Sequence, residues 1–503
     1  MTSDNAKATH GPHYGRSLVL AVLAALVVRI IVVAFVCQGF LNPGRDHWEF
    51  GFEVGMVARS IATGHGFANP FWGETGPTAW LTPVFPYFLS RIFIIFGIKT
   101  KAAAIAMLTL NSLFSALTCL PIFFVAKKTL GFRTAKWAAW IWACFPYAIY
   151  FSADSMWYHC FLTVLFALLV LIALHLESAT RLWAWAAFGV FAGLTTLTTP
   201  VVLGVLPFMI GWVCYRLQQR ARNWLVPLGT AVLGLLATIA PWVVRNYQTF
   251  HKPVFLKDNF WMEICVGNAG NDLHWWNGAV HPAQSAAEAA EIRRVGELAY
   301  LEEKRTQALR FIETSPGIYV WRCVRRIVFM WTGFWSFQSE YLREEPFDRA
   351  NIFFCTSFTL LALAGLRKAF RDRRDMAILY ALILGTFPII FYLTHPELAY
   401  RHPIDPEIVI LGAYAVVSRQ SMSKGESPRG RCRRLNLVDT NARLTAVTRS
   451  RTWTLIARNS EQDSEPQARA SRLESGNQHF ASECCFDRTS TAKSRRQSRP
   501  RPR

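Results

Sequence analysis

Ten long apolar runs, separated by short charged joints, constrain this chain more than any other feature of its sequence. Hydrophobic residues make up 52% of the 503 residues and charged residues make up 17%. A bilayer core needs ~20 apolar residues per helix, and this alternation is typical of helices that cross a membrane repeatedly. We therefore predict an all-α polytopic membrane protein with spans at about 17–37, 102–126, 137–152, 157–175, 182–197, 201–216, 225–243, 351–366, 376–394 and 406–418.

Basic residues in the joints set the orientation, because cytoplasmic loops of membrane proteins carry an excess of Lys and Arg. Two further apolar runs, 81–97 and 327–338, would invert a joint if either crossed the membrane. We predict a surface-lying or re-entrant helix for the first and an interfacial helix on the outer side for the second. With the N-terminus inside, three basic joints then face the cytoplasm: Lys127, Lys128, Arg133 and Lys136; Arg216, Arg220 and Arg222; and Arg367, Lys368, Arg371, Arg373 and Arg374.

This topology leaves two large outer regions, a first loop at about 38–101 and a second loop at 244–350. Spans and loops form one predicted domain, residues 1–418. Residues 419–503 are rich in Ser, Arg, Gln and Pro without sustained periodicity, so we predict a disordered basic cytoplasmic tail. The tail holds nineteen Lys or Arg and eight Asp or Glu, hence +11 of the net charge of +21. The positive charge therefore does not indicate a nucleic-acid partner.

The sequence contains no recognisable cofactor or metal motif. Its eleven Cys are mostly single residues, several of them inside apolar runs, and none has metal-binding spacing. Neither a Rossmann glycine pattern nor an Asp-x-Asp motif for a soluble nucleotide sugar stands out. We therefore predict no cofactor and no metal ligands, while use of a divalent metal stays open.

Three acidic residues, Asp46, Glu49 and Glu53, follow the first apolar run and so lie at the membrane surface. Carboxylates in such a place are costly to desolvate and usually serve a function. If the stretch is helical, offsets of three and seven put all three on one face. We predict that this loop supplies a base that takes a proton from an incoming nucleophile. The alternative is an interfacial loop whose acids only balance arginines.

Basic residues at outer positions are the candidates for binding a phosphate, because guanidinium groups suit paired hydrogen bonds to phosphate oxygens. Arg59 lies in the first loop, and Arg245 ends a span on the outer side. Arg401 and His402 belong to a Pro-bounded turn before the last span. The alternative is structural: Arg245 anchors its helix at the membrane surface, and the late turn only shapes the loop.

Four further residues are predicted to line the same site. Trp80 is one of several loop aromatics that suit either the headgroup layer or the face of a sugar. Asp154 lies on an outer turn between two spans. Asn268 lies in the second outer loop, and Tyr400 belongs to the late turn.

Several of these segments occur together in one known class of enzymes. They are the first-loop acids, Thr75–Trp80 (TGPTAW), Pro241–Tyr247 (PWVVRNY), the pair Gly267–Asn268 and the turn Tyr400–Pro403 (YRHP). With them the chain resembles bacterial membrane glycosyltransferases of the GT-C class, related to protein O-mannosyltransferases and to the aminoarabinose transferase of lipid A. The resemblance covers about residues 17–418, and the tail has no counterpart in it.

The resemblance implies a sugar donor linked to polyprenyl phosphate and an acceptor that enters from the periplasmic side of the bacterial cytoplasmic membrane. The acceptor is a lipid, a glycan or a protein. In the family an acidic residue of the first outer loop acts as catalytic base or positions the acceptor. The family has adjacent Asp-Glu there, whereas Asp46 is followed by His47 and the acids are spread over three positions. A single displacement, with the lipid phosphate leaving, predicts inversion at C1 of the sugar.

A lipid-linked oligosaccharide flippase or another membrane transporter is the alternative function. Transporters carry ionisable residues at mid-span and internal repeats. Arg29 is the main ionisable residue within a predicted span, and no repeat is evident. An oligosaccharide polymerase or ligase and a non-enzymatic assembly scaffold complete the alternatives.

Overall fold

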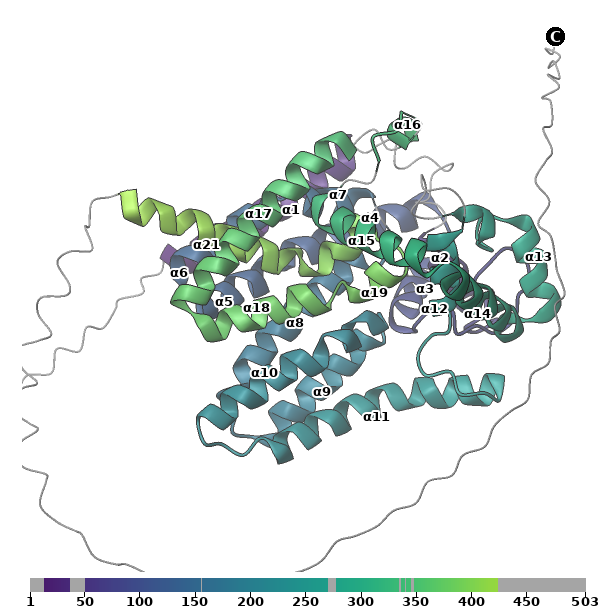
Figure 1. The fold of residues 1–503 in the computed structure, drawn as a ribbon, viewed down its shortest axis with the longest axis horizontal. Helices are drawn as coiled ribbons and strands as arrows, with labels where there is room; N and C mark the ends of the chain where they lie inside the picture. The colour runs from purple at the N-terminus through teal and green to yellow at the C-terminus, as the bar shows by residue number, and fades with distance from the viewer. Residues whose placement is uncertain are drawn as a thin grey trace, which may run out of the picture. The chain divides into compact units, whose positions relative to one another are not determined.

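The computed structural model describes residues 13–36, 50–154, 156–269, 277–333, 336–339, 341–344 and 348–423 (Figure 1). Contacts group the chain into Met1–Glu426 and Ser427–Arg503, and the second unit lies outside the described residues. Within the described part the regular elements are helices, and the β-structure there is one isolated bridge between Ala68 and Pro77. The predicted all-α class is confirmed.

Six of the predicted spans are helical segments long and apolar enough to cross a membrane. The chain is therefore a multi-pass membrane protein. The six segments are α1 (His13–Ile31) with the π-helical η1 (Val32–Val36), α4 (Lys101–Leu117) with α5 (Cys119–Thr129), α8 (His159–Leu176), α11 (Leu225–Phe250), α17 (Asp348–Asp372), and α18 (Arg374–Thr386) with α19 (Ile389–Leu393).

The four other predicted spans are helical but do not reach membrane length and hydropathy as single described helices. The last of them is longer than the predicted span 406–418 and has polar residues at both ends. The elements are α6 (Phe132–Ala143) and α7 (Pro146–Asp154) for 137–152, α9 (Leu182–Thr196), η4 (Pro200–Gly204) with α10 (Leu206–Gln219), and α21 (Asp405–Ser423).

A break between α6 and α7 divides the predicted span 137–152, which we expected to be one helix. Pro146 has no N–H to donate to the carbonyl four residues earlier, that of Trp142. The guanidinium of Arg29, buried within α1, supplies donors there instead. It donates to the carbonyl oxygens of Trp142 at 3.1 Å and Ala143 at 3.0 Å, and to the Ser115 hydroxyl at 2.8 Å. The arginine stabilises the break because buried carbonyls without donors are costly.

Glycines let α9 and α11 pack backbone to backbone. A Cβ atom at Gly189 of α9 would lie 2.0 Å from the carbonyl oxygen of Ala231 in α11. A Cβ atom at Gly234 of α11 would lie 2.7 Å from the carbonyl oxygen of Ala186. Small residues at helix crossings are typical of membrane bundles, where close packing replaces the hydrophobic effect.

The two loops that we predict to be outer fold together into one layer of helices, which we call the outer layer. Figure 1 shows α12, α13 and α14 gathered at one end of the bundle, near α2 and α3. Phe71 and Trp80 of the first loop pack in one core with Met262 and Tyr300 of the second loop. The helices of this layer are α2 (Glu53–Ala62), α3 (Val84–Phe96), α12 (Phe260–Asn268), η5 (Gly278–Val280), α13 (Ala286–Val295), α14 (Glu297–Thr314) and α15 (Pro316–Thr332).

The predicted interfacial helices have different outcomes. The run 81–97 forms the short helix α3. The run 327–338 is not a helix of its own, because α15 begins at Pro316 and ends at Thr332. Gly333 follows in a left-handed conformation, with φ 66°, which ends the helix within the predicted run. Three short elements complete the fold: α16 (Tyr341–Glu344), α20 (Leu398–Arg401) and η6 (His402–Ile404).

Candidate active site

Glu53 is the first residue of α2 and is 7% exposed. The residues before it form a turn, with φ of 52° at Phe50, 74° at Gly51 and 52° at Phe52. A continuous helix through Glu49 and Glu53 is therefore excluded, and the expectation of three acids on one helical face is wrong. Asp46 and Glu49 lie outside the described residues.

His281, from the second outer loop, faces Glu53. Its Nε2 atom lies 3.5 Å from Oε1 of Glu53, and its ring is 3% exposed. Its Nδ1 atom accepts a hydrogen bond from the Ala283 N–H at 3.1 Å, so the proton of the neutral ring is on Nε2 and points toward Glu53. Burial, with the charge of Lys304, lowers the pKa of His281 to about 3. The imidazole is thus neutral at physiological pH.

A second histidine–glutamate contact lies in the same layer. Nδ1 of His395 is 3.6 Å from Oε2 of Glu263, and its Nε2 is 3.2 Å from the Tyr400 hydroxyl. Asn259 donates to the other carboxylate oxygen of Glu263 at 2.6 Å. Burial, followed by the charge of Arg326, lowers the pKa of His395 to about 3. Burial also raises the pKa of Glu263, against the influence of Lys257.

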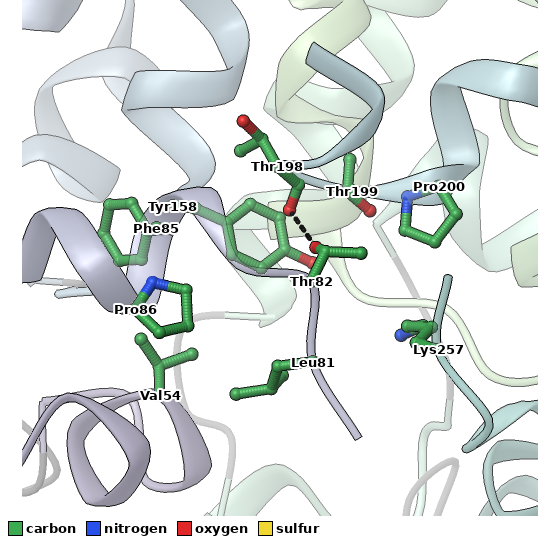
Figure 2. A pocket seen from close by; sticks show the side chains of 10 residues that line it. All are labelled: Val54, Leu81, Thr82, Phe85, Pro86, Tyr158, Thr198, Thr199, Pro200 and Lys257. Atoms are coloured by element: carbon green, nitrogen blue, oxygen red, sulfur yellow. Dashed lines mark hydrogen bonds between the residues drawn. The ribbon is translucent and has the colours of Figure 1, made fainter. Parts of the chain in front are cut away.

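A small cavity lies at the start of α2, where its wall includes Val54, the residue that follows Glu53 (Figure 2). Its volume is about 20 Å³, which is enough for about one water molecule. The cavity is lined by Val54, Leu81, Thr82, Phe85, Pro86, Tyr158, Thr198, Thr199, Pro200 and Lys257.

Lys257 is the cation of this wall. Figure 2 shows it across the cavity from Val54 and Pro86. Its ammonium group makes no hydrogen bond or ion pair with another described residue. Its charge acts on the nearby carboxyl groups of Asp258 and Glu263 and works to lower their pKa values.

The segment before Trp80 is held by the buried carboxyl group of Glu297. The Thr78 hydroxyl and the Ala79 N–H each donate to Glu297 at 2.5 Å. The N–H of Asp258 donates to the Ala79 carbonyl at 3.3 Å. Burial and the neighbouring Asp258 raise the pKa of Glu297, and burial raises that of Asp258 to about 6. The indole of Trp80 meets the His281 ring edge to face, with centroids 5.6 Å apart.

Arg245 of α11 binds the first loop. It donates to the carbonyl oxygens of Thr78 at 2.7 Å and Phe67 at 2.8 Å. Its guanidinium lies 4.9 Å from the ring centroid of Trp242. These contacts use both terminal nitrogens of the side chain, so a phosphate bound there would have to share them.

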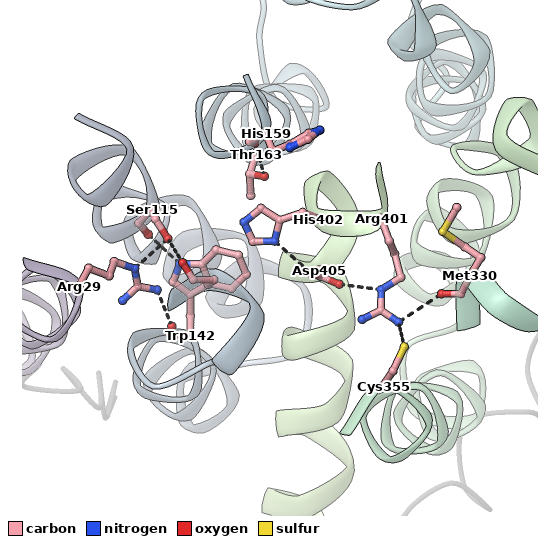
Figure 3. A network of polar contacts seen from close by, with 11 residues as sticks. Arg29, Ser115, Trp142, His159, Thr163, Met330, Cys355, Arg401, His402 and Asp405 are labelled. Atoms are coloured by element: carbon pink, nitrogen blue, oxygen red, sulfur yellow. Dashed lines mark hydrogen bonds and ion pairs between the residues drawn. The ribbon is translucent and has the colours of Figure 1, made fainter. Parts of the chain in front are cut away.

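Arg401 and His402 belong to a separate buried network (Figure 3). Arg401 donates to Asp405 at 3.0 Å, to the Met330 carbonyl at 3.3 Å and to the Cys355 sulfur at 2.6 Å. Nδ1 of His402 lies 3.1 Å from the other carboxylate oxygen of Asp405. Figure 3 shows Asp405 between the two side chains. The preceding residue, Tyr400, instead contacts His395, which lies beside Glu263.

The remaining predicted site residues lie elsewhere. Arg59 is exposed near the end of α2. Asn268 accepts a hydrogen bond from Arg326 at 2.8 Å and donates to the Ile264 carbonyl at 2.8 Å, so it ties α12 to α15. Asp154 ends α7, and its side chain lies outside the described part.

Comparisons with known proteins show which fold the chain shares with solved structures. No family model matches the chain. A search of curated sequences finds the undecaprenyl phosphate-alpha-4-amino-4-deoxy-L-arabinose arabinosyl transferase 2 of Pseudomonas fluorescens, 34% identical over 101 residues. The match covers 19% of this chain and 17% of that protein.

Among solved structures, the archaeal oligosaccharyltransferase AglB of Archaeoglobus fulgidus is similar with a TM-score of 0.50 and 15% identity. The similarity covers 84% of this chain and 53% of AglB. The chain has the GT-C glycosyltransferase fold. ArnT of Cupriavidus metallidurans matches with a TM-score of 0.45 and 14% identity, over 82% of this chain and 62% of ArnT.

Within this GT-C fold the outer layer brings together Glu53, Trp80 and Tyr400 of the predicted residues. The sequence analysis does not select His281 and His395, which contact these residues, or Glu263, Lys257 and Tyr158 nearby. The available signal was location, because Lys257 and both histidines lie in segments predicted to be outside the membrane. Among the described residues no group of three or more His, Cys, Asp or Glu is arranged to hold a metal ion.

Proposed function

We propose that this chain is a glycosyltransferase that moves a sugar from a polyprenyl-phosphate donor to a lipid, glycan or protein acceptor. The reaction takes place at the outer face of the bacterial cytoplasmic membrane. The curated relative is named for an undecaprenyl-phosphate-linked donor, and AglB is described in complex with a dolichol-phosphate and a peptide. The observation that carries the proposal is the buried contact of Glu53 with His281, next to the cavity that contains Lys257, within a GT-C fold.

A first-loop carboxylate acts as the base in this proposal. The acceptor hydroxyl or amine attacks C1 of the sugar, and the carboxylate takes its proton as the bond from C1 to the phosphate oxygen breaks. One such displacement inverts C1. Glu53 is the described candidate, and Asp46 and Glu49 remain proposed candidates. His281 positions Glu53, because its Nε2–H is directed at one carboxylate oxygen.

Lys257 is our first choice for the leaving lipid phosphate. A cation beside the departing oxygen stabilises the charge that develops there. Arg59, Arg245, Arg401 and His402 also remain proposed phosphate ligands. Arg245 and Arg401 would have to exchange present hydrogen bonds for the ligand, which favours the unpaired ammonium group. The cavity must also widen to admit a sugar, because its present volume is about 20 Å³.

We further propose that the four shorter segments complete ten crossings, which puts the basic joints inside and the α12–α14 layer outside. A transporter is less well supported, because the mid-span ion Arg29 is engaged with carbonyl oxygens of the α6–α7 break. The active site then opens to the periplasm, where acceptors of the cell envelope are available.

The test is transfer by the purified protein in liposomes that contain radiolabelled polyprenyl-phosphate sugars and an acceptor pool from cell envelopes. Glu53→Gln should lower the transfer rate at least ~100-fold, the range expected for loss of a general base. Glu302→Gln, which changes an exposed carboxylate on α14, is the matched control and should leave the rate unchanged. Wild-type rates in Glu53→Gln, Asp46→Asn and Glu49→Gln would exclude a first-loop base. Movement of label between leaflets without transfer would instead support the flippase.

A further inference from the structure

A second, larger cavity lies at the end of the bundle away from the α12–α14 layer. It forms where α5, α10 and the turn between α17 and α18 meet, at the left of Figure 1. The three basic joints of the sequence come together here. The cavity has a volume of about 340 Å³ and is lined by Lys128, Thr129, Arg216, Asp372, Arg373, Arg374, Asp375 and Met376.

The acidic groups of this cavity are already matched by cations. Asp375 pairs with Arg216, which also lies 3.4 Å from Glu177. Asp372 pairs with Lys368 at 2.5 Å and accepts a hydrogen bond from the Tyr414 hydroxyl at 2.7 Å. The two carboxylates therefore do not neutralise the remaining cations of the wall.

Three cations of the wall, Lys128, Arg373 and Arg374, are left over. Their side chains are exposed and make no hydrogen bond or ion pair with other residues in the described part of the chain. The 13-residue helix α18 begins at Arg374, so the positive end of its dipole also faces this cavity. Arginine, lysine and a helix N-terminus in one concave site are the usual donors for a phosphate group.

Apolar side chains on the same helices indicate where the phosphate comes from. Leu363 and Phe370 on α17 and Phe124 on α5 are exposed by 54%, 41% and 42%. Such residues suit contact with acyl chains, and the cavity lies at the polar ends of these membrane-length helices. Basic pockets between transmembrane helices on the cytoplasmic side are known to bind anionic headgroups.

We propose that this cavity binds a phosphate group, with an anionic phospholipid headgroup as its main source. The site is distinct from the proposed donor site, and only its cytoplasmic position rests on the topology proposed above. Lys128, Arg373 and Arg374 contact the phosphate oxygens, and the neighbouring ion pairs of Arg216 and Lys368 hold the wall in place. Occupation stabilises the junction of α5, α10 and α18, which belong to three separate parts of the chain.

Binding is measured on the full chain in nanodiscs, with phosphatidylglycerol titrated into phosphatidylcholine and bound lipid counted by native mass spectrometry. Physiological ionic strength limits non-specific attraction, because the Debye length is then about 8 Å. The variant K128A/R373A/R374A should bind phosphatidylglycerol about tenfold more weakly than wild type, since each surface cation contributes to attraction of anionic lipid. The control K127A/R367A/R371A removes the same charge from the same joints without touching the wall, and it should bind like wild type.

Two further measurements check that the variants fold and identify the source of the phosphate. Thermal unfolding in pure phosphatidylcholine checks that the triple variants are folded, and if the first is not, R373A and R374A are measured singly. Inorganic phosphate and pyrophosphate form the second arm: if they bind and phosphatidylglycerol does not, the phosphate site stands and its lipid source is rejected. Equal loss in wall and control variants, or no binding in either arm, would overturn the proposal.

Discussion

Buried and half-buried arginines in this chain satisfy carbonyl groups where regular structure ends. Arg29 donates to the carbonyls of Trp142 and Ala143 at the α6–α7 break. Arg245 and Arg326 do the same for carbonyls in the outer loops. From the sequence alone, these arginines could equally bind a ligand or a transported ion. The carbonyl groups that they bind lose their helical donors only in the tertiary fold, so no sequence pattern indicates them. A cation without such contacts, Lys257, is the sharper candidate.

Replacement of Lys257 tests the donor site at the scale of one residue. Lys257→Ala should lower kcat/KM for the polyprenyl-phosphate donor about tenfold or more, because a charge-assisted hydrogen bond contributes roughly 1.5–3 kcal/mol. Lys257→Arg should recover part of this loss, and the exposed Lys252→Ala should have no effect. The measurement is donor titration at saturating acceptor. Unchanged donor dependence in Lys257→Ala would direct attention to Arg59 and Arg401.

At the scale of elements, apolar length predicts that helices exist but not where they break. The predicted span 225–243 is helical and continues through Pro241 to Phe250 as α11. By contrast, 137–152 breaks at Pro146, where a donor from α1 compensates. Glu53 begins α2 after a turn that no helical periodicity reveals, since Phe50 and Phe52 carry no local signal for positive φ. Breaks depend on partners distant in sequence.

The α9–α11 crossing offers a matched pair of substitutions on a single helix. Gly234→Val should lower the thermal unfolding temperature by several degrees, because its side chain meets the Ala186 carbonyl and such overpacking costs about 1–3 kcal/mol. Gly229→Val, also on α11, has no atom within 4 Å of its new Cβ and should be close to neutral. Both proteins are compared by fluorescence-detected unfolding in one detergent. Equal shifts for the two variants would mean that helix propensity, and not the crossing, sets the effect.

At the scale of the molecule, the outer layer is assembled from both loops. The contacts between the two loops could not be predicted from the sequence. The prediction placed Glu53, Trp80 and Tyr400 in outer segments, and these three do reach the layer. Their contacts with His281 and His395 join residues far apart in the chain, without any motif spacing to relate them. The predicted roles of Asp46 and Glu49 fall outside the described residues. The GT-C class was predictable because short segments resemble the family along most of the chain.

The junction between the loops should respond to pH through Asp258, whose carboxyl lies beside that of Glu297. The pKa of Asp258 is about 6 in the folded chain against 3.8 for an unperturbed group, so the folded chain holds this proton more tightly. Its contribution to stability is therefore fully present below pH ~4 and is lost as pH rises to ~6. Asp258→Asn keeps a neutral side chain and should remove that loss.

Hydrogen exchange of the Thr78–Trp80 segment measures this directly, because Thr78 and Ala79 donate to Glu297. Protection in Asp258→Asn relative to wild type should be unchanged near pH 4, should grow up to about pH 6 and should then level off. The exposed Glu303→Gln on α14 serves as the control and should follow wild type throughout. Protection in Asp258→Asn that instead falls relative to wild type as pH rises would contradict this prediction. It would mean that the ionised Asp258 carboxylate stabilises the junction by accepting hydrogen bonds.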